Sequence, residues 1–268
     1  MIFHYAKRTT QNAPRAMDSL TLQSPAKLNL FLKILGRRQD GYHRMLTLFH
    51  RISLAYTLVL KKKPAGVFRL KISGSRLSAG KNNLITRAYR ELQKLVPDLG
   101  GVEVSLKKRI PMKAGLGGGS SNAAFFLLGM KRLCGLRVSK VQLLQIGRRL
   151  GADVPFFLYE ASQALGSGRG DQIQPKAFSG KLWFLLVLSN KGLTTKKVFQ
   201  KLPKRLPSVS LTKARGAVRI CCNFLRAKDL RQLSGVLKND LEAPAFQLRP
   251  SLRKTIANFE CEGIRTAR

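Results

Sequence analysis

The sequence predicts a mixed α+β protein in two parts, the first rich in both strands and helices and the second mainly helical. In the first part, apolar residues alternate with polar ones at 26–35, 67–73 and 102–108, as in strands with one buried face. Apolar residues recur at helical spacing between Asn83 and Val96. The change from strands to helices places a boundary between the two parts near residues 165–180.

Residues 1–19 hold basic residues but no apolar core of a signal peptide, and they are expected to be a disordered or irregular extension before the folded part. Strands are expected at 26–35, 45–60, 67–73 and 102–108. Asp40-Gly41 is a hairpin-like turn signal. Helices are expected at 83–96, 120–134 and 139–150, with Asn83 and Ser139 as N-caps. Residues 154–165 are predicted to be buried and extended.

The second part opens with KLWFLLVL at 181–188, a predicted buried strand because its apolar run is nearly unbroken. The remaining segments are predicted to be helical, at 195–202, 211–226, 228–239 and 250–260.

The composition narrows the class of protein. Hydrophobic residues make up 44% of the 268 residues, which is too many for a disordered chain, and no apolar run reaches the roughly 18 residues of a spanning helix. The net charge of +37 raises nucleic-acid binding as one hypothesis, but the Lys and Arg residues are dispersed. We therefore expect a basic surface that attracts anionic nucleotides. Four cysteines without metal-ligand spacing indicate reduced thiols in a cytoplasmic protein.

The segment PMKAGLGGGSSNAA at 111–124 is the most informative of the chain, with four glycines within residues 115–119. Glycine lets a backbone approach a ligand closely, and the start of a helix favours an anion. Ser120 and Ser121 are expected to cap the helix that follows. Because no Gly-Lys-Ser/Thr follows, the segment is not a Walker A loop. It suits a polyphosphate such as a nucleoside triphosphate, with a flexible turn as the alternative.

Two charged residues are candidates for chemistry. Asp153, in LGADVPFF, could take a proton from a substrate hydroxyl, or it could simply end a helix in a turn. Lys27, in SPAKLNLFL, lies in an apolar strand, where an ammonium needs a partner unless it reaches water at the strand end. Asn29 shares the face of Lys27 by the two-residue strand period. Tyr42 and His43 could stack on a base, although such a pair is also common on ordinary surfaces.

In this order and approximate spacing, five segments of the chain resemble the motifs of the GHMP kinases: SPAKLNLFL, DGYH, IPMKAGLGGGSSNAA, LGADVPFF and NDLEAPAF. The resemblance runs from about Leu22 to Arg268. It implies a ribosomal-protein-S5-like N-terminal domain over 20–175, packed on a ferredoxin-like C-terminal domain over 176–268, with the active site between them. SPAKLNLFL, DGYH and GADVPFF favour members that transfer the γ-phosphate of ATP to the 2-hydroxyl of a cytidine-diphosphate-linked methylerythritol, in the non-mevalonate route to isoprenoid precursors.

The resemblance also implies a role for each candidate residue. Asp153 would accept the hydroxyl proton, while Lys27 would hold Asp153 ionised and steady the developing negative charge. The triphosphate would be wrapped by Pro111, Met112, Lys113, Ala114, Gly115, Leu116, Gly117, Gly118, Gly119, Ser120 and Ser121. The acceptor would be bound by Asn29, Tyr42, His43, Thr195 and Phe199. Mg²⁺ would arrive with ATP, and no metal-ligating residue of the chain is expected.

The chain ends at GIRTAR, before the family's second glycine-rich loop of the SGSG type and its last strands. The resemblance therefore predicts an incomplete C-terminal domain, and an inactive fragment is one competing hypothesis. A second is a GHMP kinase that acts on homoserine or a mevalonate derivative, and a third is a basic nucleic-acid-binding protein. The remaining expectation is a monomer or homodimer with no membrane partner and no specific nucleic-acid partner.

Overall fold

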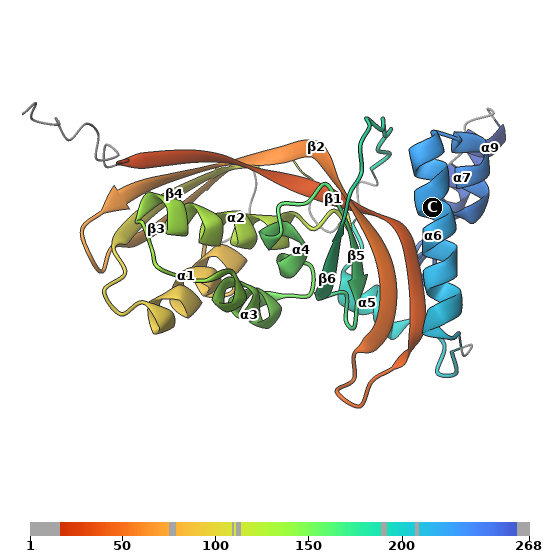
Figure 1. The fold of residues 1–268 in the computed structure, drawn as a ribbon, viewed down its shortest axis with the longest axis horizontal. Helices are drawn as coiled ribbons and strands as arrows, with labels where there is room; N and C mark the ends of the chain where they lie inside the picture. Colours follow the sequence, from red (N-terminus) through yellow and green to blue (C-terminus); the bar gives the residue numbers. More distant parts are fainter. Residues whose placement is uncertain are drawn as a thin grey trace, which may run out of the picture.

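A long antiparallel hairpin of two strands, β1 (Ser19–Arg37) and β2 (His43–Lys63), extends along most of the protein (Figure 1). The computed structural model describes residues 17–74, 79–108, 110, 114–188, 192–206 and 209–261. The register of the hairpin shifts between Pro25 and Lys27, and again between Asn29 and Phe31. These irregularities fall in the segment that the sequence marked as functional.

Five shorter strands complete the sheet in the described part of the chain: β3 (Phe68–Ser73), β4 (Gly101–Lys107), β5 (Gln163–Ser167), β6 (Gln172–Lys176) and β7 (Lys238–Asn239). The strand order is β3-β4-β2-β1-β7, while β5 pairs with β2 and β6 pairs with β5. β3 is parallel to β4 and β7 is parallel to β1, and the other pairs are antiparallel. The sheet therefore combines segments from both ends of the described chain.

The described helices are α1 (Leu84–Leu95), α2 (Gly118–Leu133), α3 (Lys140–Leu150), α4 (Val154–Leu158), α5 (Thr195–Gln200), α6 (Leu211–Ala227), α7 (Leu230–Val236), α8 (Glu242–Leu248) and α9 (Pro250–Cys261). Asn83 caps α1 by accepting from the Ile85 N–H, and Ser139 forms a capping box with Gln142 at α3. Both N-cap predictions are confirmed. None of the described helices has the length and apolar character needed to cross a bilayer.

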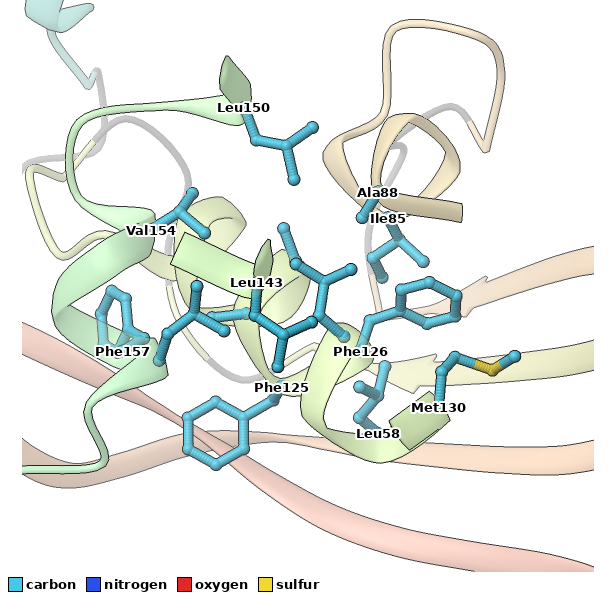
Figure 2. Close-up of a cluster of buried hydrophobic side chains, with 14 of the residues drawn as sticks. Leu58, Ile85, Ala88, Phe125, Phe126, Met130, Leu143, Leu150, Val154 and Phe157 are labelled. Carbon is cyan, nitrogen blue, oxygen red and sulfur yellow. The ribbon is translucent and has the colours of Figure 1, made fainter. Parts of the chain in front are cut away.

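The larger buried cluster lies between the sheet and α1–α4 (Figure 2). Leu58 of β2 and Phe126 of α2 are fully buried in it. Helix α2 lies close against the strands, because a Cβ added at Gly129 would come within 2.8 Å of Leu22 and 3.0 Å of Leu60 side-chain atoms. This close packing sets the position of the α2 N-terminus relative to β1.

A second buried cluster joins the other end of the hairpin to α6, with Phe31 and Leu48 packed near Val218 and Cys221. Burial raises the pKa of the Cys221 thiol to about 11, so this thiol stays protonated at neutral pH. Cys134, Cys221 and Cys222 are all free thiols. For these three cysteines, the structure agrees with the predicted reduced state.

The predicted strand at 181–188 is wrong, because the segment has no regular secondary structure. Its Leu182 and Phe184 pack on the second cluster, whereas Trp183 is 93% exposed and Leu185 is 75% exposed. A strand is held by hydrogen bonds to a neighbouring strand, and none of the described strands pairs with this segment.

Two other predicted elements need correction. Residues 154–165 are largely buried as predicted, but their first half is α4, in which Pro155 occupies the first turn. The predicted helix at 228–239 ends with α7 at Val236, because Leu237 is extended and Lys238–Asn239 pair with β1 as β7. Short apolar runs do not distinguish strand from helix.

The predicted serine cap of α2 is also wrong. The N-cap is Gly117 in the left-handed conformation, and α2 receives no side-chain capping bond. Ser121 instead lies with its Oγ 2.8 Å from the Ser24 Oγ of β1. Residues 1–16 of the expected extension, and Pro111, Met112 and Lys113 of the expected triphosphate loop, lie outside the described residues. The domain division at residue 175 stays a prediction.

Candidate active site

Lys27 is a buried ammonium surrounded by partners. Its residue is 6% exposed, and its Nζ donates to Asn29 Oδ1 at 2.6 Å. The same Nζ lies 3.6 Å from Asp153 Oδ2 and 5.7 Å from the centre of the Phe49 ring. Lys27 therefore does not reach out to water, and the interpretation of a strand-end lysine is wrong.

Asp153 lies in the turn before α4, as expected of a residue that ends a helix, but its side chain makes no capping bond to α4. Its side chain is 34% exposed, and its carboxylate faces Lys27. One side of the carboxylate is thus held by the ammonium while another side is accessible to a ligand. The side-chain oxygens of an aspartate that served only as a cap would accept hydrogen bonds from the first N–H groups of α4.

The glycine loop passes directly over Lys27. Gly115 and Gly117 have φ values of +73° and +69°, which side chains rarely adopt. A Cβ at Gly117 would lie 2.9 Å from Lys27 Cγ, and the Leu116 carbonyl accepts from the Lys27 N–H at 3.0 Å. Glycine at position 117 is therefore required both by backbone conformation and by contact with the lysine.

Two residues that sequence reasoning missed hold the loop in place. The Tyr56 hydroxyl donates to the Ile110 carbonyl at 2.8 Å, and a Cβ at Gly118 would lie 2.8 Å from the Tyr56 ring. Burial raises the pKa of Tyr56 to about 12, which keeps the hydroxyl protonated as a donor. Ser24 Oγ lies within hydrogen-bond distance of both Ser121 Oγ and Asn122 Oδ1. Ser24 opens the segment SPAKLNLFL, but its own role could not be read from the sequence, and Tyr56 carries no sequence signal, because both residues act through contacts with distant segments.

The residues expected to bind a base fall into two groups. The rings of His43 and Phe199 are 5.5 Å apart with an interplanar angle of 36°. Burial, followed by the charge of Arg37, holds the pKa of His43 below its usual value, so the imidazole is neutral at pH 7. The exposed ring of Tyr42 instead lies 4.9 Å from the guanidinium of Arg169.

Two further side chains complete the description of the site. Thr195, a predicted substrate contact, lies exposed in the first turn of α5, the helix that also carries Phe199. Thr47 of β2 was not predicted, yet its Oγ1 accepts from Asn29 Nδ2 at 2.7 Å. The one hint of it was a polar residue between Leu46 and Leu48, in an otherwise apolar run of β2. Within the described ranges, no three His, Cys, Asp or Glu side chains cluster as a metal site would require.

Comparison with known proteins identifies the family of this chain. Residues 83–161, which include the described glycine loop and Asp153, match the family model of the GHMP kinases N terminal domain. The 4-diphosphocytidyl-2-C-methyl-D-erythritol kinase of Polynucleobacter necessarius is 38% identical over 240 residues, covering 90% of this chain and 76% of the relative. The enzyme of the same name from Moorella thermoacetica is 37% identical over 254 residues, covering 94% and 86%.

Solved structures agree with this relationship. A crystal structure of 4-(cytidine 5'-diphospho)-2C-methyl-D-erythritol kinase superposes with a TM-score of 0.67 at 33% identity, covering 92% of this chain and 84% of the other. Homoserine kinase from Cytophaga hutchinsonii superposes with a TM-score of 0.57 at 15% identity, covering 89% and 77%, and shares the fold. The chain therefore belongs to the 4-diphosphocytidyl-2-C-methyl-D-erythritol kinases, a family within the GHMP kinases.

Proposed function

We propose that this chain uses ATP to phosphorylate the 2-hydroxyl of 4-diphosphocytidyl-2-C-methyl-D-erythritol. The observation that carries the proposal is the ion pair of Lys27 and Asp153 directly beneath the glycine loop. A phosphoryl transfer needs a group that accepts the proton of the attacking hydroxyl and positive charge near the transferred phosphate. The family relationship agrees with this reaction, because the relatives carry its name.

In the proposed reaction, the 2-hydroxyl oxygen attacks the γ-phosphorus while the bond to the bridging β,γ-oxygen breaks. The hydroxyl proton passes to the carboxylate of Asp153, and ADP leaves with the electron pair of the broken bond. Lys27 supplies positive charge next to the developing phosphoryl charge, and it orients Asp153 at 3.6 Å. Mg²⁺ enters as part of the nucleotide substrate and screens its phosphates.

We assign the triphosphate to the glycine loop and the cytosine to His43 and Phe199. The loop supports the first assignment through its two left-handed glycines and through the start of α2, where backbone N–H groups lack helical acceptors. The tilted rings of His43 and Phe199 support the second, because a neutral imidazole can both stack and hydrogen-bond. Tyr42, Asn29 and Thr195 complete the proposed acceptor contacts. The proposed setting is a cytoplasmic monomer or homodimer.

An acceptor comparison tests the proposed function. Purified chain is incubated with Mg·ATP and one acceptor at a time: the cytidine diphosphate alcohol, homoserine or mevalonate. ADP release and ³¹P NMR of the product are measured together. We expect a new phosphomonoester resonance with the cytidine substrate and none with the other two. Product with homoserine instead would mean that the chain has a different substrate specificity. Absence of product with every acceptor would favour the hypothesis of an inactive fragment.

A further inference from the structure

The side chain of Asn29 has two different ends, and only one of them suits Lys27. Asn29 Oδ1 accepts from the Lys27 ammonium at 2.6 Å. If the amide were turned over, its NH₂ group would face the ammonium, and two donors would oppose each other. The orientation of this amide therefore decides whether Lys27 is held in place.

Thr47 determines that orientation, because it contacts the end of the Asn29 amide opposite to Lys27. Its residue is fully buried, and its Oγ1 lies 2.7 Å from Asn29 Nδ2 and 2.8 Å from the Phe31 carbonyl. A carbonyl can only accept, so the single hydroxyl hydrogen of Thr47 points to Phe31. Only lone pairs remain for Asn29, which must present its NH₂ group to Thr47 and its oxygen to Lys27.

The backbone supplies the geometry for this chain of bonds. The register of the β1–β2 ladder shifts between Asn29 and Phe31, and the Thr47 hydroxyl bonds the Phe31 carbonyl at this irregularity. All the hydrogen bonds then run in one direction, from Lys27 to Asn29, from Asn29 to Thr47, and from Thr47 to Phe31. Buried chains of this kind strengthen when every member is satisfied.

We propose that Thr47 is a positioning residue for phosphoryl transfer, acting on Lys27 through the amide of Asn29. The proposal rests on the proposed function of the Lys27–Asp153 pair. Thr47 itself contacts Asn29 and Phe31 within the relay, so its effect should appear in turnover and not in ATP affinity.

The substitution Thr47→Val keeps the shape of the side chain and removes the hydroxyl. We expect kcat to fall about 10- to 100-fold, the range for loss of one hydrogen bond and disorder of its partner. KM for ATP should stay within about twofold. Thr47→Ser keeps the hydroxyl and should retain kcat within about threefold. Thr57→Val, the same change further along β2, is the matched control, and thermal unfolding of each variant checks its fold.

A double-mutant comparison separates a relay from a general packing effect. If Thr47 acts through Asn29, then kcat of the pair Asn29→Ala with Thr47→Val should equal that of Asn29→Ala alone. A further loss in the double variant, equal to that of Thr47→Val alone, would overturn the proposal. A wild-type kcat in folded Thr47→Val would also overturn it. If Thr47→Val fails to fold, Thr47→Ala takes its place in the same comparison.

A readout without catalysis keeps this test separate from the proposed function. The ¹⁵Nζ resonance of Lys27, assigned by its loss in Lys27→Met, should move in Thr47→Val and stay in place in Thr47→Ser. Absence of product from the wild-type chain would contradict the proposed function but not the relay. An unmoved Lys27 resonance in Thr47→Val would contradict the relay, whatever the activity.

Discussion

Buried charge at Lys27 is tolerated because its neighbours compensate for lost hydration. An ammonium moved away from water is costly unless it is paired and hydrogen-bonded. Asn29 supplies the hydrogen bond, Asp153 the opposite charge and Phe49 a ring face. The pairing with Asn29 could be predicted from the strand period. The contact with Asp153 could not be predicted from spacing alone, because it depends on how α2 packs on β1 and on how α4 packs on α2.

His50 of β2 is a second buried ionisable residue, and it allows a prediction about pH. Burial lowers its pKa from 6.5 to about 4. The unfolded chain therefore binds a proton that the folded chain excludes between these two values. Above pH 6.5 the histidine is neutral in both states and does not lower the free energy of unfolding. As the pH falls from 6.5 toward 4, the free energy of unfolding decreases by up to about 3 kcal/mol.

Urea unfolding of the wild type and of His50→Gln, at several pH values between 7 and 4, measures this effect. Gln163 Nε2 lies 3.4 Å from His50 Nδ1, and glutamine at position 50 can keep a neutral partner there. The free energy of unfolding of the variant should fall less steeply with acid than that of the wild type. If the free energy of unfolding fell equally steeply with acid in both proteins, the assignment of this pH dependence to His50 would be contradicted.

Among the elements, the backbone conformation of the glycine loop was predicted correctly, whereas the strand predicted at 181–188 was wrong. The positive φ of Gly115 and Gly117 could be predicted because glycine adopts it without steric cost, whereas the close approach of Gly117 to Lys27 was not predicted. The strand prediction failed because apolar content says nothing about whether a neighbouring strand exists to pair with it. The capping prediction for Ser121 failed for a similar reason, because Ser24 on another element lies within bonding distance.

The loop yields a prediction with a close control. Gly117→Ala places a methyl group 2.9 Å from Lys27 Cγ in a left-handed backbone. We expect kcat/KM for ATP to fall about 10- to 100-fold, because misplacement of the lysine by a fraction of an ångström disturbs the transfer geometry. Steady-state kinetics with the cytidine substrate measure the loss.

Gly135→Ala is the matched control, because Gly135 has a φ of +62° and open space around it. It should lose about 1 kcal/mol of stability from the same backbone strain while keeping its kcat/KM. Equal kinetic losses in both variants would show that strain alone, and not contact with Lys27, explains the effect.

At the scale of the whole molecule, the order of five motifs predicted the fold class and the family, and the comparisons confirm both. Motif order succeeded because it samples the chain from β1 to α8. The pairing of β7 with β1 could not be predicted, because two residues carry no periodicity. The charge of +37 says nothing of the fold, but it does bear on the encounter with anionic substrates.

This charge predicts a dependence of nucleotide binding on salt. Raising NaCl from about 0.05 M to 0.5 M shortens the screening length, so the dissociation constant for ATP should rise about tenfold or more. Isothermal titration measures it, with adenosine as the uncharged comparison. A similar salt response for adenosine would contradict an electrostatic origin.

The most direct test of the central claim is the turnover of Asp153→Asn with Mg·ATP and the cytidine diphosphate alcohol. The amide keeps the size of the side chain but cannot accept the hydroxyl proton. Asp98→Asn, an exposed aspartate on the loop after α1, is the control. The account predicts that kcat falls about 100- to 10,000-fold in Asp153→Asn, with both KM values within about threefold and Asp98→Asn like the wild type. A wild-type kcat in Asp153→Asn would contradict the claim that the Lys27–Asp153 pair performs the transfer.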